Sequence, residues 1–118
     1  MPSELLSIIV PVYNESRTVR SVIDRLLVID LPVRREILVV DDGSTDGTGA
    51  VLEQAVAEGL DVSVISAVRN AGKGSAIRLG LQQAAGTIVA IQDADLELEP
   101  QQLSALVEPI LRHEADVV

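Results

Sequence analysis

The sequence predicts an α/β fold, a parallel β-sheet with helices on both faces, and three observations indicate it. Short apolar runs of strand length alternate with longer stretches of helical periodicity along the 118 residues. Hydrophobic residues make up 47% of the chain, yet it holds one Tyr, no Phe and no Trp, so the core must be aliphatic. Aliphatic runs of this kind are typical of strands that are buried on both faces of a parallel sheet. Polar turns rich in Asp and Gly follow several of the strands. We therefore expect one domain built from consecutive βα units.

The first βα unit is indicated by residues 7–12, a continuous apolar run that we expect to be a buried strand. The apolar residues that follow have the i, i+3, i+4, i+7 spacing of one helix face: Val19, Val22, Ile23, Leu26 and Leu27. Pro32 ends this segment, and residues 36–40 are predicted to form the second strand.

Two further units complete the regular part of the pattern. We expect a helix over residues 51–56 that stops at Gly59, followed by a strand over residues 62–67. Residues 76–84 should form a helix whose small side chains let it lie close to the sheet. Residues 87–92 are predicted to be the fourth strand.

A last helix is expected to begin at Pro100, a favourable first helical residue. One face of that helix would carry Leu103, Leu106, Val107, Ile110 and Leu111. Pro109 should kink or loosen it, and residues 116–118 look like the start of another strand. We therefore expect a truncated domain, whose unfinished sheet favours marginal stability or self-association.

Composition excludes several classes of function. The net charge is −9, and no basic stripe of the kind that lines a nucleic-acid groove is visible. The chain has no cysteine, so disulfides and thiolate metal sites are impossible. It also lacks the pattern of a signal peptide and an apolar run approaching the ~20 residues of a membrane span. We expect a cytoplasmic protein.

Acidic residues at the end of the fourth predicted strand are the strongest local signal. Asp93 and Asp95 are two residues apart, so in an extended chain their side chains share a face, and Glu97 continues the series. Carboxylates suit Mg²⁺ or Mn²⁺, ions that commonly bridge to phosphate oxygens. The carboxyl ends of parallel strands also open onto the ligand crevice of an α/β sheet. The alternative is a solvated acidic turn.

A second acidic cluster, residues 41–48, follows the second predicted strand. Asp42 could accept a hydrogen bond from a base N–H or a ribose hydroxyl. Ser44, Asp46 and Thr48 are each suitable as helix N-caps, and for Ser44, Thr45 and Thr48 we favour a structural role in a turn and cap.

The same region matches the residue types and spacing of a calcium-binding loop. The residues at loop positions 1, 3, 5, 6 and 12 would be Asp42, Ser44, Asp46, Gly47 and Glu53. A calcium hand needs a helix before its loop, whereas a strand is predicted here. We interpret the match as accidental.

Two more loops carry candidate binding residues. Tyr13, the only aromatic residue, follows the first strand and could pack against a nucleotide base; the alternative is a surface tyrosine. Residues 69–75 are glycine-rich and open a helix, so their amides could face an anion, although the spacing is not that of a P-loop. Lys73, the only lysine, is a candidate for a phosphate contact, and a flexible cap is the alternative.

Taken together, four segments resemble the nucleotide-sugar-binding half of the family 2 glycosyltransferases, which have the Rossmann-like GT-A fold. In order along the chain they are IVPVYNE (9–15), VVDDGSTDGT (39–48), NAGKGSA (70–76) and DADLE (93–97). Residues 72–78 and 93–100 look most like the dolichol- or polyprenyl-phosphate sugar transferase branch.

The resemblance implies roles for particular residues. Asp93, Asp95 and Glu97 would hold Mg²⁺ or Mn²⁺ on the donor diphosphate. The residues implied in binding the nucleotide sugar are Pro11, Tyr13, Glu15, Val40, Asp42, Lys73, Asp93, Ala94 and Asp95. No catalytic residue is identified, and a phosphate acceptor, being ionised already, would need no general base.

The implied activity is inverting, metal-dependent transfer of a sugar from a UDP- or GDP-linked donor to an acceptor such as polyprenyl or dolichyl phosphate. Residues 1–118 would be the donor-binding part, inactive alone, of a protein at the cytoplasmic face of a membrane. One alternative is a nucleotidyltransferase, which usually carries a basic, glycine-rich loop where this chain has Tyr13-Asn14-Glu15. The other is a non-catalytic nucleotide- or calcium-binding module.

Overall fold

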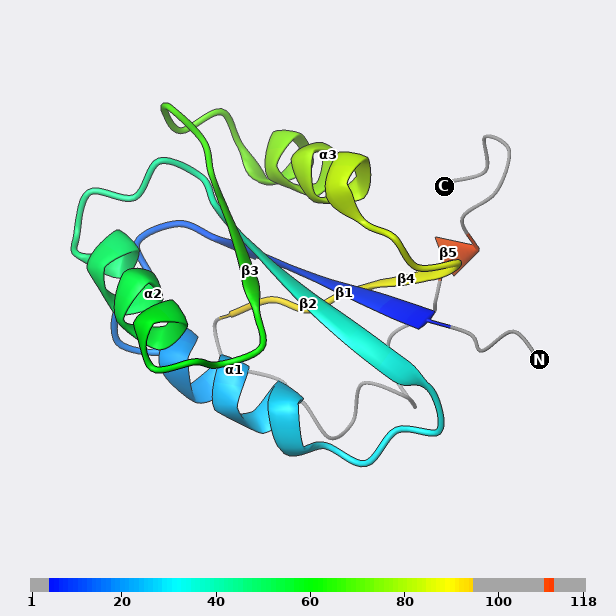
Figure 1. Cartoon of the computed structure of the whole chain (residues 1–118). Coiled ribbons are helices and arrows are strands. Elements are labelled where there is room, and N and C mark those ends of the chain that lie inside the picture. Colours follow the sequence, from blue (N-terminus) through cyan, green and yellow to red (C-terminus); the bar gives the residue numbers. More distant parts are fainter. Residues whose placement is uncertain (1–4, 95–109, 112–118) are drawn as a thin grey trace.

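The computed structural model of the protein describes residues 5–94 and the short segment Ile110–Leu111. Within these residues the chain forms one sheet with the strand order β3-β2-β1-β4-β5 (Figure 1). The strands are β1 Leu5–Val12, β2 Arg34–Asp41, β3 Ser63–Ser66, β4 Ile88–Ile91 and β5 Ile110–Leu111. The first four are parallel to one another, which confirms the predicted parallel sheet.

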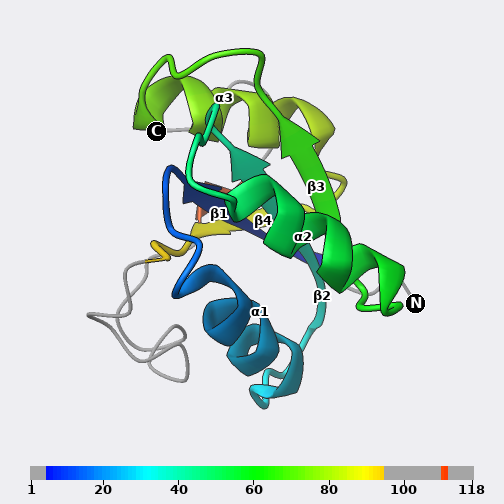
Figure 2. The same ribbon diagram turned by 90° about the vertical axis from the view of Figure 1, so that its left-hand side faces the viewer.

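Three helices cover the two faces of the sheet. Helices α1 (Val19–Val28) and α2 (Thr48–Ala57) lie on one face, and α3 (Lys73–Gln83) lies on the other (Figures 1 and 2). Each of these helices was predicted from its apolar spacing, and so was the strand that precedes it. In the part of the chain that the structure describes, none of the helices combines the length and apolarity needed to cross a membrane.

The central strand β1 supplies both layers of the core because its side chains alternate between the two faces of the sheet. Ile8 and Val10 pack with α1 and α2, whereas Ile9 packs with α3, and all three are fully buried. Fully burying such aliphatic side chains contributes about 1.5–3 kcal/mol each. This rigid double layer fixes the carboxyl end of β1.

Helix α3 lies very close to the sheet at Gly80. A Cβ atom added to Gly80 would lie 2.8 Å from Cγ2 of Ile9, closer than carbon atoms normally approach. The small side chains predicted for this helix therefore serve close packing, and they bring the start of α3 near the ends of β1 and β2.

One expectation about the end of the chain is wrong. Ile110 and Leu111, predicted on one face of a last helix, form the short strand β5 and pair antiparallel with Val89 and Ile88 of β4. Pro109 directly precedes them, and proline both lacks the amide donor that a helix interior needs and disfavours helical geometry in the residue before it. The remaining residues of the predicted helix, and the strand expected at 116–118, lie outside the described residues.

Candidate functional site

The candidate site lies at the carboxyl ends of β1, β2 and β4. The strand order reverses at the β1/β4 pair, since β2 and β3 lie on one side of β1 and β4 lies on the other. In open α/β sheets ligands bind at such switch points. Backbone hydrogen bonds hold the strand ends together just past the ladders: Gln92 N–H donates to the Ile9 carbonyl and Asp42 N–H to the Val12 carbonyl, each at 2.9 Å.

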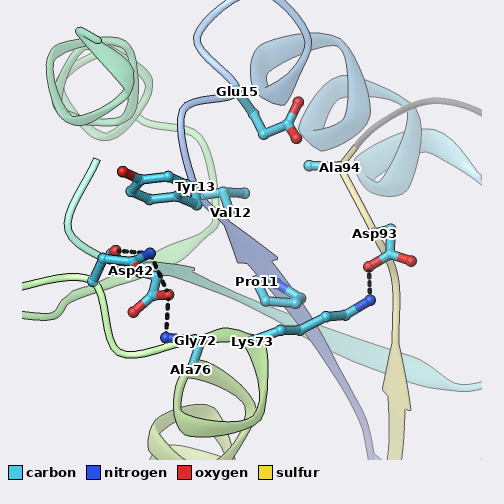
Figure 3. Close-up of a pocket in the computed structure, with 11 residues that line it drawn as sticks. Pro11, Val12, Tyr13, Glu15, Asp42, Gly72, Lys73, Ala76, Asp93 and Ala94 are labelled. Atoms are coloured by element: carbon cyan, nitrogen blue, oxygen red, sulfur yellow. Dashed lines mark hydrogen bonds and ion pairs between the residues drawn. The ribbon is translucent and has the colours of Figure 1, made fainter. Parts of the chain in front are cut away.

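A cavity of about 310 Å³ opens at this point, within the lower range of small-molecule sites (Figure 3). It is lined by Pro11, Val12, Tyr13, Glu15, Asp42, Asn70, Gly72, Lys73, Ala76, Asp93 and Ala94. Seven of these were candidates from the sequence, and they converge from the ends of three strands and the start of α3. Tyr13, with 44% of its surface exposed, offers its ring to the opening.

The other candidates are placed differently. Val40 is fully buried in the core layer beneath α3, so its side chain does not line the cavity. Asp95 and Glu97 lie outside the described residues. Val12, Asn70, Gly72 and Ala76 were not predicted as lining residues; for Asn70 and Gly72 the signal was present, because they belong to the glycine-rich loop that the sequence singled out.

Asp42 organises the glycine-rich loop. Its carboxylate accepts hydrogen bonds from the backbone N–H groups of Ala71 (3.0 Å) and Gly72 (2.9 Å) and from the Asn70 side-chain amide (3.0 Å). Only 4% of Asp42 is exposed. A buried carboxylate that accepts several N–H donors is strongly held, because charge-assisted hydrogen bonds are the stronger class. Asp42 thus fixes the loop that carries Lys73 against the end of β2.

Two reciprocal hydrogen bonds join the loop after β1 to the loop after β2. The backbone N–H of Asn14 donates to the Ser44 hydroxyl, and the backbone N–H of Thr45 donates to the Asn14 side-chain oxygen, both at 2.8 Å. Asn14 has a φ of 54°, the left-handed conformation that asparagine tolerates better than most residues. These bonds hold the backbone on either side of Tyr13 and Glu15.

A second set of contacts joins the same loop to the end of β4. Thr48, predicted only as a cap, accepts the backbone N–H of Glu15 at 3.0 Å and is fully buried. The Thr18 hydroxyl can donate to the Glu15 carboxylate (3.1 Å) or to the carbonyl oxygen of Ala94 (2.7 Å). No feature of the sequence indicated Thr18, because its partner is 76 positions away.

Asp46 lies just before Gly47, the N-cap residue of α2, and its carboxylate bonds both to the start of α2 and to the first loop. One carboxylate oxygen accepts the Thr48 hydroxyl (2.5 Å) and the Thr48 backbone N–H (3.0 Å), and the other accepts the backbone N–H of Ser16 (3.3 Å). The bond from the Thr48 hydroxyl is the largest cause that lowers the pKa of Asp46, with the bonds to the Thr48 backbone and to Ser16 adding to it. The pKa falls from 3.8 to about 2.

This shift makes a prediction about stability. A carboxyl whose pKa is lower in the folded state stabilises the fold above its unfolded pKa, and that contribution is lost as the pH falls through the folded value. Replacing Asp46 with Asn should therefore lower the urea midpoint at pH 7, and the gap from wild type should narrow between about pH 4 and pH 2. Far-UV circular dichroism would follow unfolding, since the chain has no Trp. A gap that stays constant over this range would contradict the assignment. Asp61→Asn, on an exposed carboxyl, serves as the control.

Lys73 and Asp93 form an ion pair at the opening of the cavity. The Lys73 ammonium lies 2.5 Å from Oδ1 of Asp93, and Figure 3 shows the lysine reaching from the start of α3 to the end of β4. The two side chains are 57% and 50% exposed. Both groups therefore remain accessible to a ligand.

The arrangement has the chemistry to bind an anion together with a cation. Asp93 already attracts a cation, the lysine ammonium, and its oxygens are the hard donors that Mg²⁺ and Mn²⁺ prefer. No group of three or more potential metal ligands occurs within the described residues. One carboxylate fits such an ion nonetheless, because Mg²⁺ is usually held by one or two carboxylates, with substrate phosphates and water completing its shell.

The geometry also rules against the calcium-loop reading of residues 42–53. The segment before it is strand β2, not a helix. Asp42 and Asp46, two of the supposed ligands, turn their oxygens to the glycine-rich loop and to Thr48. The aspartates of this segment serve hydrogen bonds between loops.

Comparison with known proteins identifies the relatives of this chain. The model of the family "Glycosyl transferase family 2" matches residues 7–118. A dodecaprenyl-phosphate galacturonate synthase from Rhizobium johnstonii is 34% identical over 116 residues, which are 96% of this chain and 34% of that protein. An undecaprenyl-phosphate 4-deoxy-4-formamido-L-arabinose transferase from Pseudomonas fluorescens is 38% identical over 110 residues, covering 91% and 32% respectively. The chain thus spans about a third of the length of these curated relatives.

Solved structures of other glycosyltransferases share the fold of this chain. A mannosyltransferase from Pyrobaculum calidifontis, in complex with GDP-Man and Mn²⁺, matches with a TM-score of 0.75 and 30% identity over 86% of this chain and 30% of that one. A glucosyl-3-phosphoglycerate synthase from Mycobacterium tuberculosis, in complex with Mn²⁺, UDP and glucosyl-3-phosphoglycerate, matches with a TM-score of 0.70 and 32% identity over 87% and 38%. These likenesses confirm the predicted GT-A fold.

Proposed function

Because the chain belongs to glycosyl transferase family 2, we propose that it forms the nucleotide-sugar-binding part of an inverting, metal-dependent glycosyltransferase. One observation carries the proposal: the ends of β1, β2 and β4 and the start of α3 converge on a single cavity. That cavity combines an exposed aromatic ring, a lysine and a carboxylate. These three groups suit the base, the diphosphate and the metal of a nucleotide-sugar donor.

The nucleoside would lie between the loops after β1 and β2. The exposed Tyr13 ring can stack on a base, and Pro11 and Glu15 line the same cavity. Asp42 uses three of the roughly four acceptor positions of a carboxylate on the glycine-rich loop, which leaves about one for a base N–H or a ribose hydroxyl. Asp42 would then serve both loop and ligand.

The diphosphate and the metal would lie between α3 and β4. Lys73 can reach the phosphates, and Asp93 would hold the metal together with Asp95 and Glu97, with Ala94 between the two aspartates. When bound, Mg²⁺ or Mn²⁺ neutralises negative charge on the leaving diphosphate. In the transfer, an acceptor oxygen forms the new bond to the anomeric carbon, and the bond from that carbon to the diphosphate breaks.

The donor and acceptor classes follow from the same reasoning. The solved neighbours named above hold GDP-Man or UDP together with Mn²⁺, which supports a GDP- or UDP-linked donor. Two relatives are named for transfer involving polyprenyl phosphates, which supports such an acceptor and a full-length protein that works at a membrane surface. An acceptor phosphate would attack as an anion, so the proposal needs no general base.

The test is calorimetric titration of the chain with UDP, GDP and a nucleotide sugar, with Mn²⁺ and with EDTA. We expect Mn²⁺ to strengthen binding by about tenfold or more, equivalent to ~1.4 kcal/mol or more. Asp93→Asn should remove most of this gain, because it removes a negative metal ligand while leaving an exposed side chain of the same shape. Equal nucleotide affinity with Mn²⁺ and EDTA in the wild type would refute the proposal.

Glu53→Ala is the matched control, since it removes the last acidic residue of the supposed calcium loop. It should leave the Mn²⁺ dependence unchanged. If Glu53→Ala lost its metal dependence and Asp93→Asn kept it, the metal would belong to the loop of residues 42–53, and the assignment to Asp93 would be wrong.

A further inference from the structure

The ion pair between Lys73 and Asp93 joins the two groups that the proposed function assigns to different parts of the donor. Lys73 was assigned to the diphosphate and Asp93 to the metal, yet here the lysine ammonium occupies Oδ1 of Asp93. The ammonium lies 2.5 Å from Oδ1 and takes one of the roughly four acceptor positions of the Asp93 carboxylate. A divalent cation bound to the same carboxylate would compete with the ammonium for its negative charge and repel it.

We propose that Lys73 is an internal counter-ion that holds Asp93 before the metal binds and moves to the donor phosphates when it does. The inference rests on the proposed function and deepens it, because it makes the lysine couple metal binding to nucleotide binding. Metal alone competes with Lys73 for Asp93. Metal that arrives with a diphosphate gives Lys73 a new anionic partner, so each ligand favours the other.

The backbone of Lys73 is fixed while its side chain is free to move. Lys73 is the first residue of α3, and the preceding residue, Gly72, donates its N–H to the buried carboxylate of Asp42. The long, flexible side chain of Lys73 is 57% exposed, and the residue lines the same cavity as Tyr13. The ammonium can therefore leave Asp93 and stay within the cavity without any movement of the loop.

The strength of the pair sets the size of the effect. Half-exposed ion pairs are weak, so displacing Lys73 should reduce the affinity for metal alone by about two- to fivefold. A loss of affinity of this size is small enough that a divalent ion can still displace the ammonium. A hydrogen bond from an ammonium to a phosphate oxygen is stronger, so losing it should weaken nucleotide binding by about tenfold or more.

The decisive experiment measures two affinities of Lys73→Met, in which the stem is kept and the charge is lost. Water-proton relaxation would follow Mn²⁺ binding without nucleotide, and calorimetry would follow UDP and GDP binding at saturating Mn²⁺. We expect opposite changes: Mn²⁺ alone binds about two- to fivefold more tightly than to wild type, and the nucleotide about tenfold more weakly. A lysine that only stabilised the fold would not produce opposite signs.

Two further variants separate competition at Asp93 from a general charge effect. Arg69→Met removes a positive charge from the same loop and should leave the Mn²⁺ affinity close to that of wild type. In an Asp93→Asn background, Lys73→Met should no longer tighten Mn²⁺ binding, because the negative charge for which the two cations compete is gone; this double-mutant cycle isolates the pair. Unchanged thermal midpoints would exclude misfolding of the variants.

The outcomes distinguish this inference from the proposed function. Metal-dependent nucleotide binding in wild type, with Mn²⁺ affinity equal in Lys73→Met and wild type, would overturn the counter-ion role alone. Equal tightening in Lys73→Met and Arg69→Met would do the same. Nucleotide binding that does not respond to Mn²⁺ in wild type would overturn both.

Discussion

Replacing Asp42 with Asn is expected to lower the free energy of unfolding by roughly 2 to 4 kcal/mol and to weaken nucleotide binding by about tenfold or more. The Asp42 carboxylate accepts N–H donors on both of its oxygens, from Ala71 on one and from Gly72 and Asn70 on the other. Asparagine keeps only one acceptor oxygen. Its amide group would place N–H against N–H in a site where the wild-type residue is only 4% exposed.

The binding defect should follow from the position of the loop. Released from the end of β2, the glycine-rich loop would no longer hold Gly72 and Lys73 at the cavity. UDP and a UDP-sugar should therefore lose affinity by similar factors, because the loop and the nucleoside are affected and the sugar is not. Urea unfolding and calorimetry of the same samples would measure both effects. A loss confined to the sugar conjugate would show that the base is misplaced, and Asp61→Asn should change neither value.

Replacing Gly43 with Ala is expected to be at least as damaging, by roughly 3 kcal/mol or more. A Cβ atom at Gly43 would lie 2.5 Å from the backbone carbon of Arg69 and 2.5 Å from the backbone nitrogen of Asn70. Backbone atoms cannot rotate out of the way as a flexible side chain can. The variant must either unfold this region or push the glycine-rich loop off Asp42, and it should lose nucleotide binding in both cases.

Gly47→Ala provides a matched control for Gly43→Ala. Both glycines have positive φ, 76° at Gly43 and 100° at Gly47, but nothing lies within 4 Å of a Cβ at Gly47. Gly47→Ala should therefore show the backbone strain alone, about 1–2 kcal/mol, and retain nucleotide binding. Equal unfolding midpoints for the two variants would contradict the close approach of the loops at Gly43.

The regular elements were predictable because each depends on local spacing. Ile8, Ile9 and Val10 lie in an apolar run, and their burial on two faces follows from the geometry of a strand. The segment Ile110–Leu111 was not predictable in this way, because apolar residues fit a helix face and a short strand equally well. Its pairing with β4 depends on a partner more than 20 positions earlier in the chain.

The location of the cavity was predictable from the sequence, but the contacts within it were not. The carboxyl ends of the strands indicated Tyr13, Asp42 and Asp93, and all three line one cavity. That Asp42 turns its carboxylate to the glycine-rich loop could not be inferred, because its partners are 28 to 30 positions away. The same holds for Thr18 and Ala94, whose residue types carry no signal of a tertiary hydrogen bond.

The hydrogen bonds that build the cavity have a consequence for how the chain folds. They join residues far apart in sequence: 30 positions separate Asn14 from Ser44, and 76 separate Thr18 from Ala94. Closing such long loops is entropically unfavourable and has to precede the contacts that reward it. The ligand pocket should therefore be absent from partly folded chains. A donor would bind only the fully folded state and would stabilise it by RT ln(1 + [L]/Kd).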